Sequence, residues 1–133
     1  MFLILPYPPS VNHYYVRTKW GGLCISAKGQ SYRKETAVLC RGLKSSSIDK
    51  PIHMEVSIIP PDKRKRDIDN ICKALLDSLQ YAAVFNDDNQ IQKLTLIKYP
   101  HLINKKIVVS PTHGVINCTQ GKIFVRIFLA TES

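Results

Sequence analysis

The chain has 133 residues, of which 44% are hydrophobic, and a formal net charge of +9 at pH 7. This length and apolar content fit one domain of ordinary size, and so short a chain gains stability from association because a monomer buries a limited share of its surface. The positive charge favours a polyanionic partner such as nucleic acid. No apolar run approaches the length of a membrane span, so we expect no membrane association.

The four cysteines are scattered and form no Cys-x-x-Cys pair, and no signal peptide precedes them. The four histidines likewise lack the spacing of metal ligands. These observations argue against a zinc site and favour free thiols in a reducing, cytoplasmic compartment.

The amino-terminal third predicts one strand and one helix. Residues 2–5 form a short apolar strand, and the prolines that follow predict an extended loop because proline lacks the backbone donor of a central strand. Residues 11–25 favour a loop or hairpin with a turn at Gly21-Gly22. Ser26 is expected to cap a helix over residues 27–44. The apolar positions of this helix are Tyr32, Val38, Leu39 and Leu43, and its weakening glycines are Gly29 and Gly42.

The middle of the chain predicts a strand and a second helix. The serines at 45–47 and Pro51 form a linker, after which residues 52–59 alternate between apolar and polar, as in a half-buried strand. A helix is expected over residues 68–83, because its apolar residues recur at the helical period. They are Ile68, Ile71, Cys72, Leu75, Leu76 and Leu79.

The last third predicts strands. Residues 86–89 read as a turn and residues 91–98 as a strand. Residues 105–109 and 122–129 are expected to be two final strands, which could pair as a hairpin. The order of elements predicts a mixed α/β (α+β) fold, a single domain over residues 1–133 with a mixed sheet and two main helices.

The acidic residues are concentrated in one segment of this basic chain. Of ten Asp and Glu residues, six lie between positions 62 and 88: Asp62, Asp67, Asp69, Asp77, Asp87 and Asp88. Asp67 and Asp69 stand at the start of the second helix, and Asp88 lies in the following turn. If strand 91–98 pairs beside strand 52–59, that turn would lie near the helix start and the carboxylates would converge. Such oxygens suit Mg²⁺, which nucleases use to activate water and to stabilise phosphate charge.

Basic residues accompany the acidic segment. The run Lys63-Arg64-Lys65-Arg66 would hold a DNA backbone beside carboxylates that otherwise repel phosphate. Lys73 is one helical turn from Asp69 and could neutralise charge that develops in a transition state.

Each feature also has a simple structural explanation. Asp67 and Asp69 could cap a helix, Asp69–Lys73 could be a surface ion pair, and the basic run could be a solvated loop. The spacing alone therefore leaves two alternatives to a nuclease: a non-catalytic nucleic-acid-binding protein, and a small structural component of a ribonucleoprotein. Clustered carboxylates favour the nuclease, because a binding module has no need of groups that repel phosphate.

Three segments, in order, resemble the RusA family of Holliday-junction resolvases. One is Pro8-Pro9-Ser10-Val11-Asn12-His13-Tyr14-Tyr15, and another is Ser26-Ala27-Lys28-Gly29-Gln30-Ser31-Tyr32-Arg33. The third runs from Asp67-Ile68-Asp69-Asn70 through Lys73 and Asp77 to Asn86-Asp87-Asp88-Asn89-Gln90-Ile91. The resemblance covers about residues 3–99 and is weak after Pro100.

The resemblance implies a homodimeric, magnesium-dependent endonuclease, common in prophages, that cuts four-way DNA junctions in recombination and repair. It places Asp67, Asp69 and Asp88 as metal ligands, with Mn²⁺ expected to substitute for Mg²⁺. Lys73 would be an essential lysine near the scissile phosphate. Asp77 and Asp87 match acidic positions of the pattern and would lie behind the ligands.

Overall fold

The computed structural model describes residues 1–42 and 48–130. The elements of this part of the chain are β1 (Phe2–Pro6), α1 (Val11–Tyr14), β2 (Tyr15–Arg17), β3 (Leu23–Ile25), α2 (Ala27–Leu39), β4 (Ile52–Ile59), the 3-10 helix η2 (Ile68–Ile71), α3 (Cys72–Tyr81), the 3-10 helix η3 (Asp88–Gln90), β5 (Ile91–Lys98), the 3-10 helix η4 (Pro100–Leu102), β6 (Lys106–Ser110), β7 (Gly114–Asn117) and β8 (Lys122–Leu129).

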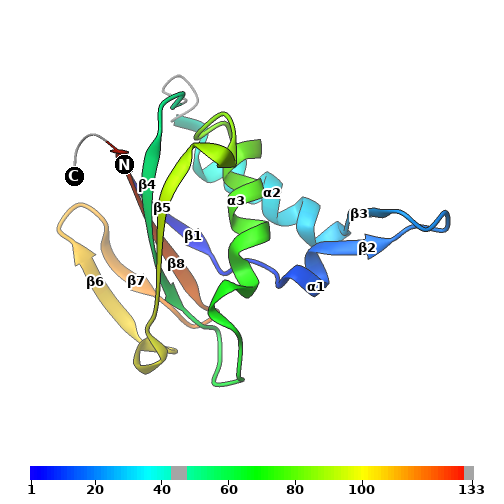
Figure 1. Ribbon diagram of the computed structural model, residues 1–133. Coiled ribbons are helices and arrows are strands. Elements are labelled where there is room, and N and C mark those ends of the chain that lie inside the picture. Colours follow the sequence, from blue (N-terminus) through cyan, green and yellow to red (C-terminus); the bar gives the residue numbers. More distant parts are fainter. Residues whose placement is uncertain (43–47, 131–133) are drawn as a thin grey trace.

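A four-stranded sheet in the order β1-β8-β4-β5 forms the centre of the molecule. β8 pairs antiparallel with both β1 and β4, whereas β5 pairs parallel with β4, so the sheet is mixed. Helices α2 and α3 lie on one side of the sheet and the β6–β7 hairpin lies on the other (Figure 1). The predicted mixed α/β fold with two main helices is confirmed.

Strand β4 has the boundaries and the alternation that its sequence predicts. Ile52, Met54, Val56 and Ile58 are at most 2% exposed and belong to the main core, together with Leu75 of α3. Burial of such a residue contributes about 1.5–3 kcal/mol. The parallel β4–α3–β5 unit therefore has a rigid base, on which the loops at its two ends are positioned.

Both final strands predicted for residues 105–109 and 122–129 are present, but they do not pair as the hairpin that the sequence left open. Residues 106–110 pair instead with β7, a strand not predicted from the sequence, and β8 lies between β1 and β4. Ile123, Val125 and Ile127 alternate into the main core. On the other face of β8, Phe124 is buried in a second cluster against β6 and β7, whereas Arg126 is exposed. The apolar run of β8 thus signals a central strand rather than one arm of a surface hairpin.

Helix α2 begins as predicted and ends earlier. The Ser26 hydroxyl accepts a hydrogen bond from the Gly29 backbone N–H at 3.0 Å, which confirms Ser26 as the cap. The helix ends at Leu39 rather than at residue 44, and Val38 and Leu39 are 56% and 52% exposed, contrary to the predicted apolar face. Leu43 and the serines at 45–47 lie outside the described residues.

The second predicted helix consists of two parts. Its first turn is the 3-10 helix η2, and the α-helix proper begins at Cys72 and ends at Tyr81, two residues short of the prediction. Ile71, Leu75 and Leu79 are buried, as the helical period predicts, whereas Ile68 is 39% exposed. Within the described residues, no helix is both long enough and apolar enough to cross a lipid bilayer.

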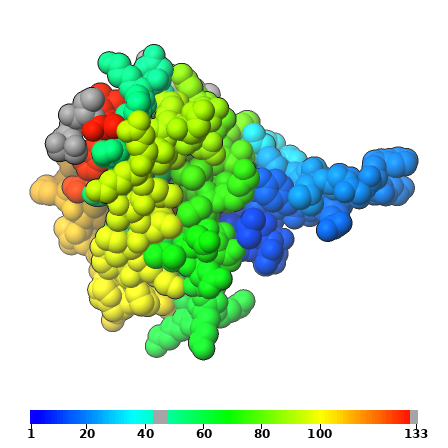
Figure 2. All heavy atoms as spheres, viewed as in Figure 1, coloured from blue at the N-terminus to red at the C-terminus, as the bar shows by residue number. Residues whose placement is uncertain are grey.

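The segment before α2 forms a short helix, α1, and a hairpin arm. Strands β2 and β3 pair around the turn at Gly21-Gly22, which confirms the hairpin expectation for residues 11–25. The arm extends away from the rest of the molecule (Figures 1 and 2).

Candidate active site

The first candidate residues lie where the chain leaves β4 and enters α3. Asp67 is the residue before η2, and its exposed side chain makes no capping hydrogen bond. Asp69 lies within η2, and Lys73 is the second residue of α3. In the described part of the chain, none of these three side chains has a hydrogen bond or ion-pair partner. All three therefore remain available to a ligand.

Asp87 and Asp88 are adjacent but play different parts. The Asp87 carboxylate accepts a hydrogen bond from the Asn89 N–H at 2.9 Å, and its own N–H donates to Gln90 Oε1 at 2.8 Å, which forms a capping box for η3. The Asp88 N–H donates to Gln80 Oε1 at 3.1 Å. No described residue engages the Asp88 carboxylate, so only Asp88 of this pair presents a free anion.

Asp69, Lys73 and Asp88 line one hollow of about 410 Å³ alongside α3. Its other lining residues are Val11, Asn70, Cys72 and Leu76. Burial, followed by the nearby charge of Asp69, raises the pKa of the Cys72 thiol, which keeps it a neutral thiol at neutral pH. The hollow thus combines two carboxylates, an amide and one ammonium group on a partly apolar floor.

The predicted convergence of three carboxylates is only partly present. Strand β5 does pair beside β4, but the pairing is parallel and places Ile91 opposite Ile52 at the start of β4. Asp88 therefore lies beside Gln80 near the end of α3, whereas Asp67 follows the other end of β4 and does not line the hollow. Among the described residues, no three Asp, Glu, His or Cys side chains form a metal-holding group.

The donor set nevertheless fits Mg²⁺. This ion is commonly held by one or two carboxylates, while water and substrate phosphate supply its other ligands. Asp69 and Asp88 are two exposed carboxylates that share a hollow, and Asn70 adds an amide oxygen. Two carboxylates and an open side match the requirement of an ion that must also contact a phosphate.

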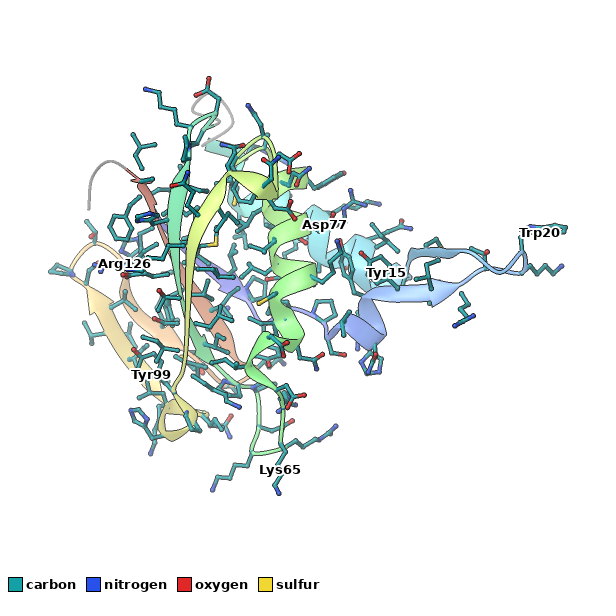
Figure 3. All side chains as sticks on the ribbon, in the orientation of Figure 1. Tyr15, Trp20, Lys65, Asp77, Tyr99 and Arg126 are labelled. Atoms are coloured by element: carbon teal, nitrogen blue, oxygen red, sulfur yellow. The ribbon has the colours of Figure 1, made fainter. Side chains whose placement is uncertain are left out.

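A second hollow, of about 450 Å³, adjoins the first through Asn70 and is basic. It is lined by Tyr7, Pro9, Ser10, Asn12, His13, Lys28, Pro61, Arg64, Lys65, Arg66, Asn70 and Ile71. Three members of the predicted basic run line it, whereas Lys63 does not. Lys65 projects from the tip of its loop into solvent (Figure 3). This arrangement places cations directly beside the acidic hollow, as binding of a phosphate backbone requires.

Asp62 organises the basic loop. Arg66 donates to Asp62 Oδ1 at 2.7 Å and the Arg64 backbone N–H donates to the same oxygen at 2.9 Å. The Arg66 hydrogen bond, together with that of Arg64, lowers the pKa of Asp62 to about 2. Lys98 donates to the Arg66 carbonyl at 2.7 Å and joins the loop to β5. The loop therefore has a defined shape although its cations are exposed.

Asp77 lies on α3 but outside both hollows. The Tyr14 hydroxyl donates a hydrogen bond to its carboxylate, and Arg33 Nε lies 3.5 Å from Asp77 Oδ2. The Arg33 guanidinium also stacks over the Tyr81 ring at 4.2 Å. Asp77 thus joins α1, α2 and α3, and its position is that of an anchor rather than of a neighbour of Asp69 and Asp88.

Several residues that line the two hollows were not predicted as site residues from the sequence. Val11 lines the acidic hollow, and Ser10, Asn12, His13 and Lys28 line the basic one. All five belong to the two amino-terminal segments that carry the resemblance, but no charge cluster or ligand spacing marked them. The resemblance of these segments to the family was the only sign in the sequence that they matter. The folded structure places them beside α3.

Comparison with known proteins gives a consistent family. The family model described as Endodeoxyribonuclease RusA matches residues 6–110. A crossover junction endodeoxyribonuclease rusA of Enterobacteria phage HK97 is 43% identical over 96 residues, which cover 71% of this chain and 79% of that protein.

Two further relatives carry the same description. The protein of Enterobacteria phage 82 is 37% identical over 99 residues, covering 74% of this chain and 82% of the relative. That of Escherichia coli strain K12 is 37% identical over 102 residues, with 74% and 82% covered. The family match includes both hollows and the β4–α3–β5 unit, whereas β8, a central strand of the sheet, lies beyond it. The chain belongs to the RusA family of endodeoxyribonucleases.

Proposed function

We propose that this chain is a magnesium-dependent endonuclease that cuts four-way DNA junctions, and that it acts in DNA recombination and repair. The observation that carries the proposal is the hollow shared by Asp69, Lys73 and Asp88, which adjoins a basic hollow. The relatives named crossover junction endodeoxyribonucleases support the choice of substrate. Relatives in phages HK97 and 82 support a phage or prophage origin.

Asp69 and Asp88 would hold the ion, and Asp67, which lies two residues before Asp69 but does not line the hollow, would become a further ligand when DNA is bound. Their exposed and unpaired carboxylates support this assignment. A bound Mg²⁺, or Mn²⁺ in its place, supplies the activation of water and the stabilisation of phosphate charge that hydrolysis needs.

The chain's own residues would do the rest. Lys73 extends an ammonium group into the hollow, where it would neutralise negative charge that develops on the phosphate. Arg64, Lys65 and Arg66 would contact neighbouring phosphates and hold the backbone in register. Asp87 would act indirectly, because its capping box fixes the turn that presents Asp88.

We also propose a homodimer. Productive resolution of a four-way junction needs two cuts related by a two-fold axis, and one acidic hollow supplies one cut. Two copies related by a two-fold axis, the commonest oligomer symmetry, supply both. Exposed apolar side chains support association: Val108 and Val115 on the β6–β7 hairpin are 74% and 62% exposed. Sedimentation should give about twice the chain mass, and a strict monomer on and off DNA would contradict the dimer.

The test of the function is cleavage of a labelled synthetic four-way junction. With Mg²⁺ the protein should introduce paired cuts, and with EDTA it should bind the junction without cutting. The Asp69→Asn variant should bind and not cut, because the substitution keeps the side-chain size and removes the charge. Binding without any cleavage by the wild type would instead support a non-catalytic DNA-binding protein.

A further inference from the structure

The arm formed by β2 and β3 projects from the molecule (Figure 1) and lines neither hollow. We propose that the arm is a DNA probe, and that Trp20 at its tip stacks on a nucleobase exposed at the branch point of a DNA junction. The inference rests on the proposed function, because it assumes that branched DNA binds at the hollows. Figure 3 shows Trp20 at the far end of the arm, remote from the sheet.

The exposure of Trp20 is unusual for its residue type. This side chain is 90% exposed, and it is the single tryptophan of the chain. Isolated exposed apolar residues are common, so exposure alone carries no argument. A tryptophan held at the tip of an ordered projection is different, because a flat aromatic surface is what an unstacked base requires.

The tip is held in a defined conformation. The Thr18 N–H donates to the Gly22 carbonyl at 2.8 Å, and the Gly21 N–H donates to the Thr18 carbonyl at 3.1 Å. The Thr18 hydroxyl oxygen accepts from the Gly22 N–H at 3.1 Å. Gly21 has φ +84°, a conformation that glycine adopts without strain. The turn therefore fixes the backbone from which the Trp20 side chain projects.

The base of the arm is fixed to the helix that lines the acidic hollow. Tyr14, which directly precedes β2, is fully buried and donates to Asp77 of α3. The Ser26 hydroxyl, which follows β3, donates to the His13 carbonyl at 2.6 Å. Val11 of the adjoining α1 lines the same hollow as Asp69. A DNA strand placed at the hollow is thus held in a fixed relation to the arm.

The positive charge of the arm favours nucleic acid as its partner. No Asp or Glu precedes Glu35 in the chain, and the arm carries two cations, Arg17 and Lys19, just before Trp20. A second copy of this chain is the competing partner, but its net charge of +9 would repel the arm. Positive charge beside an aromatic ring matches nucleic acid, in which phosphates and bases alternate.

The length of the arm places its tip away from the acidic hollow. Tyr15 and Trp20 are five residue steps apart, through β2 and into the turn, so the arm reaches at most roughly 16 Å from Tyr15 to Trp20. This length corresponds to about five base steps of B-form DNA. Trp20 would therefore contact bases away from the reacting phosphate and would distinguish a branch point, where bases are unstacked, from uninterrupted duplex.

The single tryptophan makes its own fluorescence the direct test. Metal-free protein is titrated with a four-way junction in EDTA, and in parallel with duplexes that carry the same arm sequences and the same number of ends. Stacking should quench Trp20 emission and shield it from acrylamide on the junction, and much less on the duplexes. Equal emission and equal acrylamide access on both DNAs would overturn the proposal.

Matched variants separate ring stacking from apolar bulk. Trp20→Leu and Trp20→Ala should weaken junction affinity by roughly 5- to 100-fold, because the stacking surface is lost. Trp20→Tyr should recover most of the affinity. Leu23→Ala is the control, because Leu23 is 67% exposed on the same arm and should have no effect. Loss of affinity in Leu23→Ala as well, or none in Trp20→Ala, would overturn the proposal.

The outcomes also separate this inference from the proposed function. A wild type that cuts junctions while Trp20 stays unquenched overturns the inference alone. A wild type that binds no DNA overturns both. In the DNA-free protein, Trp20 emission could instead be blue-shifted and shielded from acrylamide, with both effects lost on dilution. That result would place Trp20 against a second copy of the chain and overturn the inference.

Discussion

The Tyr14 hydroxyl donates a hydrogen bond to the Asp77 carboxylate, across 63 positions of the sequence. This contact joins the amino-terminal segment to the helix that carries Lys73, and Arg33 of α2 completes the cluster. Asp77 matched an acidic position of the family pattern, and the structure assigns it to holding three helices together. The geometry of the candidate site therefore depends on a partly buried contact that lies outside it.

Tyr14 also predicts a pH dependence of stability. Burial, reinforced by the hydrogen bond to Asp77, raises the pKa of Tyr14 above its ordinary value. The folded state then holds the phenolic proton more tightly than the unfolded state. This stabilisation is complete below about pH 10, the unfolded pKa, and is lost as the pH rises through the folded pKa.

Tyr14→Phe is the corresponding variant. At neutral pH it should lower the free energy of unfolding by about 1.5–3 kcal/mol, because a hydrogen bond to a charged group is lost. Above pH 10 the wild type should lose stability more steeply than the variant, by up to about 1.4 kcal/mol per pH unit. Urea unfolding at several pH values measures both effects, and parallel curves above pH 10 would contradict the assignment.

Lys73 should matter to turnover more than to affinity. Lys73→Ala removes the ammonium group of the acidic hollow and leaves the buried face of α3 untouched. The single-turnover rate of junction cleavage should fall by about 10²-fold or more, with little change in junction affinity. Lys34→Ala, an exposed lysine on α2, is the control. If Lys73→Ala changes only the melting temperature, Lys73 has a structural role.

The basic loop should supply phosphate contacts without base recognition. Replacing Arg64 and Lys65 together by Ala should weaken binding to different DNA sequences alike, and should reduce the salt slope of affinity by about two. Lys50→Ala with Lys106→Ala makes the same change in net charge outside both hollows. A salt slope that responds equally to both double variants would place the DNA elsewhere.

Two glycines associated with α2 should respond oppositely to alanine. A Cβ on Gly29 would lie 2.7 Å from Ile25 Cγ2 and 2.8 Å from the Tyr14 carbonyl oxygen, at the base of the arm. Gly29→Ala should therefore lower the free energy of unfolding by about 1–3 kcal/mol. A Cβ on Gly42 meets nothing within 4 Å, so Gly42→Ala should be neutral or stabilising. Thermal unfolding compares the two, and equal effects would contradict the packing described.

Local patterns predicted most of the individual elements. The alternation in residues 52–59 predicted which side chains of β4 are buried, and Ser26 predicted where α2 begins. Both features depend on only a few neighbouring residues. The pairing of β8 was not predictable in this way. Its partners β1 and β4 are distant in sequence, and an apolar strand does not specify its neighbours.

The same limit applies to the candidate site. The sequence placed Asp69 and Lys73 one turn apart, which the helix preserves in one hollow. It did not reveal that the parallel β4–β5 pairing would place Asp88 near Gln80 and leave Asp67 outside. Nor did it separate Asp87 from Asp88, because their difference lies in the capping box.

The difference between Asp87 and Asp88 allows the most direct test of the account. Junction cleavage in Mg²⁺ is measured for Asp88→Asn and Asp87→Asn, two identical changes at neighbouring positions. Asp88→Asn should bind the junction as well as the wild type or better, and its cleavage rate should fall by orders of magnitude. Asp87→Asn should keep most of the activity, because an asparagine side chain can still accept the capping hydrogen bond. Wild-type cleavage by Asp88→Asn would contradict the proposed site.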